Sequence, residues 1–256
     1  MSTVPTTAPT SVKPSLGEAP GKASDVEAMF DEIAPRYDLL NRVMSFGTDV
    51  WWRKRARAFL ADALVGRPRR LMDVATGTAD LAFELLTLGP DEVVGVDISE
   101  GMLSVGRDKV RGRGLADRIR LVQGDASDLP FESDSFDGTT VAFGVRNFEN
   151  LRAGLAGMGR VLRPGAPLVV LEFSHPTVFP VKQGYELYSK HVMPRIGSAV
   201  SGTREAYEYL PESVAQFRDG EDFLDEMRAV GFTECVVEPL TFGIASLYRG
   251  LAPGGK

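Results

Sequence analysis

The apolar and polar positions of this chain follow two periods in turn. Short apolar runs, which predict buried strands, lie at 70–75, 92–97, 118–124, 138–143 and 167–173. Segments with apolar residues at helical spacing lie between them, at 80–88, 100–112 and 150–162. Strands that alternate with helices in this way predict an α/β fold, with a parallel sheet and helices on both of its faces.

The C-terminal part of the chain departs from this alternation. Residues 175–218 hold several Tyr, Pro and Gly residues, and we predict that they form a helical lid inserted over the carboxyl edge of the sheet. A helix is predicted at 221–229. Two further apolar runs, 232–238 and 244–248, are close enough to pair as a hairpin, which makes the predicted sheet seven-stranded and mostly parallel.

The N-terminal part has two segments. Residues 1–22 are rich in Thr, Pro, Ser, Ala and Gly and have almost no large apolar side chain, which predicts a disordered tail. The pattern is helical from 23 to 66, where Trp52, Phe59 and Leu60 share one face of a helix. We therefore predict a single domain over 23–256 whose first part, 23–66, is a helical cap.

Composition narrows the class of protein. The 256 residues are 43% apolar, enough for a folded core, and the net charge of -6 argues against general binding to nucleic acid. Cys235 is the only cysteine, so no intrachain disulfide can form, and its apolar surroundings predict a buried thiol in a strand. No apolar run approaches the ~18 residues of a membrane span, and the N-terminus lacks the pattern of a signal peptide. The expected location is the cytoplasm.

Polar residues follow three successive strands of the predicted sheet. Gly77 allows a tight turn after the first strand, the carboxylate of Asp97 at the end of the second can accept the hydroxyls of a ribose, and Asp125 follows the third. The turn lacks the glycines of a dinucleotide-binding motif and the lysine of a P-loop. S-adenosylmethionine, an adenosine ligand without a pyrophosphate, fits this pattern best. The alternative is a tight turn followed by a solvated aspartate.

The fourth strand is followed by an arginine. Arg146 and Asn147 come directly after this buried strand, where a charge loses its hydration unless a partner compensates for it. Arg146 is therefore a functional candidate. The alternative is a structural ion pair with Asp38 or Glu172.

Long stretches of the chain resemble one known family over about residues 26–250. Residues 37–47, YDLLNRVMSFG with Trp52 five positions on, and residues 160–174, RVLRPGAPLVVLEFS, are similar to the two signatures of the ubiquinone and menaquinone biosynthesis C-methyltransferases. Residues 143–147, FGVRN, and 191–197, HVMPRIG, also resemble family segments. The resemblance implies the class I S-adenosylmethionine-dependent methyltransferase fold, which is Rossmann-like.

The resemblance also implies the cofactor site. It implies that Thr78, Asp97, Asp125 and Ala126 contact S-adenosylmethionine, and the pattern of the strand ends adds Asp73 and Gly77 to the predicted cofactor-binding residues. Two positions depart from the family, which usually has Gly at Ala79 and often Ser at Ala142. The methyl of Ala79 is expected to crowd the methionine part of the cofactor, so we expect altered affinity rather than lost activity.

The substrate class implied by the resemblance is the reduced ring of a demethylated isoprenoid quinone, methylated on carbon. A ring carbon becomes nucleophilic when the neighbouring hydroxyl ionises, and a guanidinium at Arg146 favours that phenolate. Asn147 and Tyr37 are expected to orient the hydroxyl or to relay its proton. No metal is required. His191 is expected to pack in the lid, with a role as base as the alternative, and His175 is expected to be structural.

Several alternatives stay open. Demethylmenaquinol is the favoured acceptor, with the benzoquinol of the ubiquinone pathway or another hydrophobic small molecule as rivals, and a non-catalytic scaffold that binds S-adenosylmethionine as a rival of another class. Trp51, Trp52 and the basic run 53–55 form either a peripheral membrane contact or, as we favour, a core tryptophan beside a solvated face. The sequence does not decide between a monomer and a homodimer.

Overall fold

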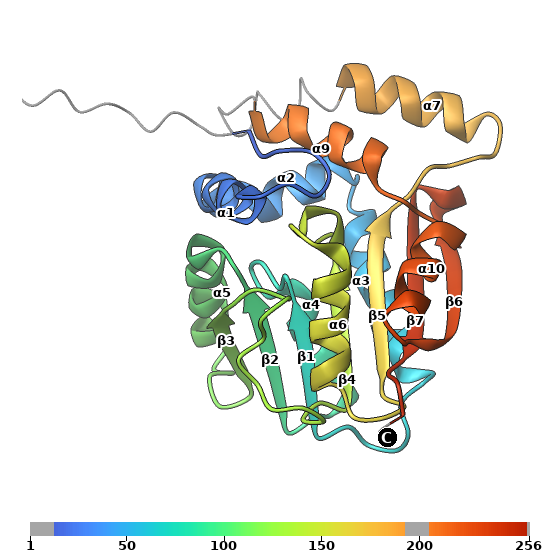
Figure 1. The fold of residues 1–256 in the computed structure, drawn as a ribbon. Helices are drawn as coiled ribbons and strands as arrows, with labels where there is room; N and C mark the ends of the chain where they lie inside the picture. The colour runs from blue at the N-terminus through green and yellow to red at the C-terminus, as the bar shows by residue number, and fades with distance from the viewer. Residues whose placement is uncertain (1–12, 193–204, 255–256) are drawn as a thin grey trace, which may run out of the picture.

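The computed structural model describes residues 13–192 and 205–254. Its sheet is seven-stranded, in the order β3-β2-β1-β4-β5-β7-β6 (Figure 1). The strands are β1 (Arg70–Val74), β2 (Glu92–Asp97), β3 (Ile119–Gln123), β4 (Gly138–Ala142), β5 (Pro167–Phe173), β6 (Thr233–Leu240) and β7 (Ala245–Leu251). The first five pair in parallel, whereas β7 pairs antiparallel with both β5 and β6. The predicted sheet, with its closing hairpin, is therefore confirmed.

The helices fall into two groups. Those that pack on the faces of the sheet are α3 (Thr48–Ala61), α4 (Asp80–Leu85), α5 (Glu100–Gly112), α6 (Leu151–Val161) and α10 (Glu221–Ala229). Those that lie over the carboxyl ends of the strands are α1 (Lys22–Ile33), α2 (Tyr37–Met44), α7 (Val181–Leu187) and α9 (Glu205–Gln216) (Figure 1). Single turns complete the path: η1 (Ala34–Arg36), η2 (Leu86–Leu88), η3 (Val145–Asn147), η5 (Thr241–Gly243) and a π-helical turn, η4 (Tyr188–Val192).

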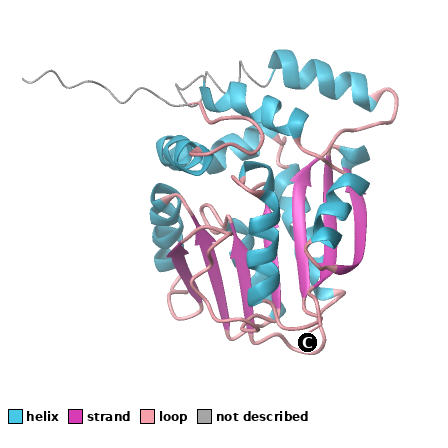
Figure 2. Ribbon diagram, in the orientation of Figure 1, coloured by secondary structure: helices cyan, strands magenta, loops and turns pink. Residues whose placement is uncertain are grey.

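Helices lie on both faces of the sheet (Figure 2), and alternate residues of each strand build two cores, one on each face. Met72 of β1 packs with residues of α6 and α10, such as Leu155 and Phe223. Its neighbour Leu71 points the other way and packs with residues of α3 and α4, such as Phe59. Since both faces are buried, the parallel strands read as continuous apolar runs, and this is why their positions could be predicted.

The chain reverses its direction of travel along the sheet at β1, which lies between β2 and β4. Ligands of open α/β sheets bind at such a switch point, outside the carboxyl ends of the strands. The cap helices α1 and α2 lie over this edge, and α9 of the predicted lid lies beside them (Figure 1). The middle of the lid, 193–204, lies outside the described residues, as do residues 1–12.

The boundary of the tail differs from its prediction at residue 22. Lys22 is buried and begins α1, and its Nζ donates hydrogen bonds to the carbonyl oxygens of Arg146, at 3.0 Å, and Phe148, at 3.2 Å. Leu16 also packs against the cap. A lysine counts as polar in a sequence pattern, but here backbone carbonyls compensate for its burial. The division into tail, cap and lid otherwise stays a prediction.

Two smaller predictions concern the burial of Cys235 and the absence of membrane-spanning segments. Cys235 is half-buried in β6, and burial raises the pKa of its thiol. Every helix in residues 13–192 and 205–254 falls short of the length and apolar character needed to cross a bilayer.

Candidate functional site

A cavity of about 310 Å³ lies at the carboxyl ends of β1, β2, β3 and β4. It brings together six of the predicted site residues: Tyr37, Gly77, Asp97, Asp125, Ala126 and Asn147. Val26 and Phe30 of the cap and Met102 of α5 add apolar side chains to its lining. The convergence of three strand ends on one crevice, inferred from the pattern of the sequence, is therefore what the fold produces.

Asp97 is held by backbone donors at the edge of this cavity. Its Oδ2 accepts from the N–H of Gly77 at 2.7 Å and its Oδ1 from the N–H of Ser99 at 2.9 Å. Gly77 has a φ of 54°, a conformation in which glycine carries no steric cost. Burial raises the pKa of Asp97 to about 6, although these hydrogen bonds oppose the rise. A carboxylate has about four lone-pair sites, so Asp97 keeps capacity to accept from a ligand hydroxyl.

Asp125 and Ala126 form the wall of the cavity next to α6. The Oδ1 of Asp125 accepts from the N–H of Ser127 at 2.7 Å and from its hydroxyl at 2.6 Å, so the side chain stabilises a turn through one oxygen. Ala126 is buried against α6. A carboxylate for a ribose, a second acceptor for an amino group and an apolar wall fit an adenosine ligand.

Two residues predicted to bind the cofactor lie beside the cavity rather than in its lining. Asp73 is buried, accepts hydrogen bonds from the hydroxyls of Thr76 and Thr140, both at 2.7 Å, and has its pKa raised by burial to about 7. The hydroxyl of Thr78 donates to Asp38 at 2.6 Å. The structure thus gives both residues protein partners, and their contact with a cofactor stays a prediction.

A second cavity, of about 450 Å³, lies between the cap, the sheet and α7. Most of its lining is aromatic or aliphatic, with Trp52, Phe143 and Phe173 close together: the rings of Phe143 and Phe173 are 4.6 Å apart between centroids. Phe30, Tyr37 and Phe143 line both cavities. Phe143 has a φ of 58°, a strained conformation of the kind found at functional sites. The two cavities therefore adjoin at these three side chains.

Arg146 lines the second cavity and pairs with one of the two carboxylates proposed for it. Its Nη1 lies 2.7 Å from Oε1 of Glu172 and 2.6 Å from the carbonyl oxygen of Phe143. Glu172 is fully buried, which raises the pKa of its carboxyl, and the charge of Arg146 opposes that rise. Asp38, the other candidate partner, pairs with Lys109 instead, at 2.8 Å.

The other two predicted catalytic residues differ in the cavities that they line. Tyr37 begins α2 and separates the two cavities, and burial raises the pKa of its hydroxyl. Asn147 lines the first cavity only, where its Oδ1 accepts from the hydroxyl of Tyr209 at 3.0 Å. Asn147 therefore faces a different cavity from Arg146, a placement that its position next to Arg146 in the sequence did not indicate.

The two histidines lie away from both cavities. His191 is exposed on η4 and does not line the second cavity, although it belongs to the lid as predicted; Met193, its expected neighbour, lies outside the described residues. His175 pairs with Asp219, at 3.0 Å from Nδ1 to Oδ2, and joins the start of the lid to its end. This pairing raises the pKa of His175 and agrees with the structural role expected for it.

The two departures from the family pattern have different settings. Ala79 is buried in the core with Trp52 and Leu85 and lies outside the lining of the first cavity, and the crowding expected from its methyl group stays a prediction. Its φ of 71° is left-handed, and this explains why glycine suits the position. Ala142, by contrast, lines the first cavity.

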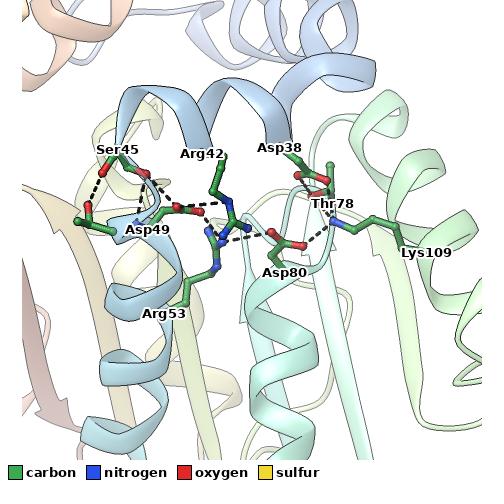
Figure 3. Close-up of polar contacts among 9 residues, drawn as sticks. Asp38, Arg42, Ser45, Asp49, Arg53, Thr78, Asp80 and Lys109 are labelled. Atoms are coloured by element: carbon green, nitrogen blue, oxygen red, sulfur yellow. Dashed lines mark hydrogen bonds and ion pairs between the residues drawn. The ribbon is translucent and has the colours of Figure 1, made fainter.

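The basic run 53–55 does not form the uniformly solvated face that was predicted. Trp52 is buried, as favoured, and its Nε1 donates to the hydroxyl of Thr241 at 2.8 Å. Arg53 is buried too, and Arg55 pairs with Glu238. Figure 3 shows Arg53 within a set of charged side chains that joins α2 and α3 to the turn after β1 and to Lys109 of α5. A pattern of residue types gives no signal for such pairing.

Solved structures with this fold include two that cover most of the chain. The [4+2]-cyclase SpnF has a TM-score of 0.66 at 17% identity and covers 95% of this chain and 98% of its own. An S-adenosylmethionine-dependent methyltransferase of Thermotoga maritima has a TM-score of 0.59 at 19% identity, over 87% and 97%. The sheet order, the closing hairpin and a cavity whose acceptor groups fit adenosine are typical of the class I S-adenosylmethionine-dependent methyltransferases, and this chain is one of them.

Similarity in sequence identifies the family. The model of the ubiE/COQ5 methyltransferase family matches residues 19–252, and the chain belongs to this family. A demethylmenaquinone methyltransferase of Porphyromonas gingivalis is 46% identical over 245 residues, 95% of this chain and 98% of the relative. One of Deinococcus radiodurans is 48% identical over 239 residues, 93% and 97%. The ubiquinone/menaquinone biosynthesis C-methyltransferase UbiE of Geobacter sulfurreducens is 45% identical over 231 residues, 90% and 89%.

Proposed function

We propose that this protein methylates a ring carbon of a demethylated isoprenoid hydroquinone, with demethylmenaquinol as its acceptor. The observation that carries the proposal is the pair of adjoining cavities. One has acceptor groups that fit adenosine, and the other is mostly apolar and is lined by Arg146. The names of the relatives in Porphyromonas gingivalis and Deinococcus radiodurans support the naphthoquinol as acceptor.

The first cavity would hold S-adenosylmethionine. Asp97 would accept the ribose hydroxyls, Asp125 the adenine amino group, and the N–H of Ala126 would donate to a ring nitrogen. Gly77 holds Asp97 in place through its N–H. When bound, S-adenosylmethionine supplies an electrophilic methyl group, so the protein needs no nucleophile of its own.

In the second cavity Arg146 would act on the ring hydroxyl next to the reacting carbon. A phenol has an ordinary pKa of about 10, so its ionisation at neutral pH needs a nearby positive charge. The guanidinium supplies it, held in place by Glu172 and the carbonyl of Phe143. Because burial raises the pKa of Tyr37, this residue stays neutral and would donate a hydrogen bond to the developing phenolate.

Asn147 would act from the cofactor side of the shared wall. Its Oδ1 accepts from the hydroxyl of Tyr209, and its amide nitrogen donates to the carbonyl oxygen of Phe143 at 3.4 Å, so the second N–H of the amide is the donor left to orient a ligand. The aromatic side chains around the acceptor ring exclude water, and alignment of the reacting atoms in such a site contributes several kcal/mol, about 7 or more in favourable cases.

Peripheral membrane contact would bring the isoprenoid tail to this cavity. Exposed apolar side chains lie on the segments that surround the cavity: Leu39, Val43, Phe46, Val178, Phe179, Leu187 and Phe242. Exposed apolar patches of this kind mark contact with lipid or protein. A tail that stays in the bilayer fits this face, because the same elements line the cavity that would take the ring.

The test is methyl transfer from labelled S-adenosylmethionine to reduced demethylmenaquinol, with the demethylated benzoquinol in parallel. Removal of Arg146 alone leaves Glu172 buried without its cation, at a cost of about 3–5 kcal/mol, so the informative variant is Arg146→Gln with Glu172→Gln. We expect turnover of the naphthoquinol and a kcat about 10²- to 10³-fold lower in the double variant, with unchanged affinity for S-adenosylmethionine.

The rivals give other results. Turnover of the benzoquinol alone would move the protein to the ubiquinone pathway. No turnover of either ring by a protein that binds S-adenosylmethionine would point to another hydrophobic acceptor or to a non-catalytic scaffold. A double variant as active as the wild type would remove Arg146 from the mechanism.

A further inference from the structure

Arg53 is a second buried cation beside the proposed acceptor site. It lies on α3 between two carboxylates, with its Nη2 2.6 Å from Oδ2 of Asp49 and 3.3 Å from Oδ2 of Asp80 (Figure 3). Its side chain is only 10% exposed, and both Arg53 and Asp49 line the apolar cavity. A guanidinium buried this deeply is costly unless its donors are used.

The bonds of Arg53 leave donors unused. Both contacts to the carboxylates are made by Nη2, and within the part of the chain that the structure describes Nη1 and Nε make no hydrogen bond. Asp49 is in turn fixed by the hydroxyl of Ser45, at 2.8 Å. The guanidinium is thus held from one side, with its other donors available to a ligand in the cavity.

Arg53 and Arg146 reach the same region from different elements, α3 and η3. Tyr37 lines the same cavity as both arginines, and their charges lower the pKa of its hydroxyl, against the larger effect of burial. The cavity therefore presents two guanidinium groups near the side chain that separates it from the cofactor cavity.

We propose that Arg53 binds the second oxygen of the acceptor ring, the one across the ring from the hydroxyl beside Arg146. This inference rests on the proposed function, since a hydroquinone carries two oxygens on opposite sides of its ring. Two fixed cations would set the orientation of the ring in its plane, so that the carbon to be methylated faces the cofactor cavity. They would also make the site selective for dihydroxylated rings.

A merely structural role for Arg53 has a different consequence. Asp80 begins α4 directly after the turn of the cofactor cavity, and Lys109 also binds it. If Arg53 served only to join α3 to this turn, its loss would weaken the binding of S-adenosylmethionine and would affect all acceptor rings equally. The binding of the cofactor is thus a readout that separates the two roles.

The experiment compares two probes that bind without reaction, in the full chain saturated with S-adenosylhomocysteine under anaerobic conditions. One is a 1,4-naphthalenediol with a short prenyl chain. The other is the corresponding naphthol, which keeps the hydroxyl next to the carbon to be methylated and lacks the second hydroxyl, across the ring. Their dissociation constants are measured for the wild type, Arg53→Met and Arg53→Lys. The matched control is Arg42→Gln, because Arg42 contacts the same Asp49, at 3.8 Å, but is 51% exposed and lies outside the lining of the cavity.

We expect the wild type to bind the diol about tenfold or more tightly than the naphthol, and Arg53→Met to weaken the diol about ten- to hundredfold while changing the naphthol by less than about threefold. Arg53→Lys should restore part of the loss, and Arg42→Gln should change neither probe. Equal losses for the two probes, a wild type without preference for the diol, or weaker cofactor binding in Arg53→Met would each overturn the assignment of Arg53. A wild type that binds neither ring would instead overturn the proposed acceptor class, and the role of Arg53 with it.

Discussion

The position of Asp97 at the end of a strand could be predicted from the sequence, whereas its environment could not. Its place at the end of β2 follows from the apolar run before it. Its hydrogen bonds from the backbone of Gly77 and Ser99, and the burial that raises its pKa to about 6, come from the packing of the cap above the sheet.

This pKa predicts how binding of S-adenosylmethionine depends on pH. Ribose hydroxyls donate to the ionised carboxylate, and the raised pKa means that Asp97 takes up a proton as the pH falls through about 6. Affinity should therefore be constant above pH 7 and fall as the pH decreases toward 5. Asp97→Asn should lower the affinity at pH 7.5 about ten- to hundredfold and flatten this dependence.

Titration calorimetry between pH 5 and 8 measures both effects. Asp73, whose pKa is about 7, lies close by and is the control, since Asp73→Asn should keep the fall in affinity below pH 6 if Asp97 causes it. A wild type with the same affinity at pH 5 and pH 7.5 would contradict the role of Asp97.

At the scale of elements, α6 and the loop of Asp125 and Ala126 depend on one close approach. A Cβ at Gly157 would lie 2.1 Å from the carbonyl oxygen of Ala126, so α6 can pack against the loop only with glycine there. Gly159, two residues on, would place its Cβ 3.4 Å from the ring of Phe232, an ordinary contact.

Gly157→Ala is therefore predicted to destabilise the protein by about 1–3 kcal/mol and to weaken the binding of S-adenosylmethionine, because the loop must move. Gly159→Ala, in the same helix, should leave the stability unchanged or raise it by up to about 1 kcal/mol, since alanine favours a helix. Urea unfolding and calorimetry of the two variants provide the comparison. Equal stability of the Gly157→Ala and Gly159→Ala variants would contradict this prediction, because it would show that the loop of Asp125 and Ala126 moves at little cost.

At the scale of the whole molecule, seven of the ten exposed large apolar side chains in the described residues lie on the side of the cap and lid, where the carboxyl ends of the strands also lie. If this face contacts a bilayer, Leu187→Ser with Phe242→Ser should reduce binding to phospholipid vesicles about tenfold or more, since burial of each side chain contributes up to about 1.5–3 kcal/mol. Neither side chain lines a cavity, so methylation of a short-tailed acceptor should be unaffected.

Val65 offers the control for this prediction. It is 99% exposed but lies in the loop between α3 and β1, at the amino end of the strands, and Val65→Ser should leave the binding to vesicles unchanged. Vesicle sedimentation measures all three proteins. A similar loss in Val65→Ser, or none in the double variant, would argue against a specific membrane face.

The sequence by itself determined the order and type of the elements and the strand ends that bear polar residues. Strands buried on both faces need continuous apolar runs, and the helices between them need one apolar face, so both leave a local signal. The positions of Gly77, Asp97 and Asp125 relative to these elements followed directly, and their convergence followed from the parallel sheet.

Only the tertiary structure decided which charged groups meet. Arg146 was placed correctly after β4, but its choice of Glu172 over Asp38 depends on β5 lying next to β4, while Asp38 is drawn to Lys109 of α5. Lys22 and Arg53 looked like solvated residues and are buried. The physical reason is that the cost of burying a charge is offset by partners far away in the sequence, and no local pattern records which partners the fold brings within reach.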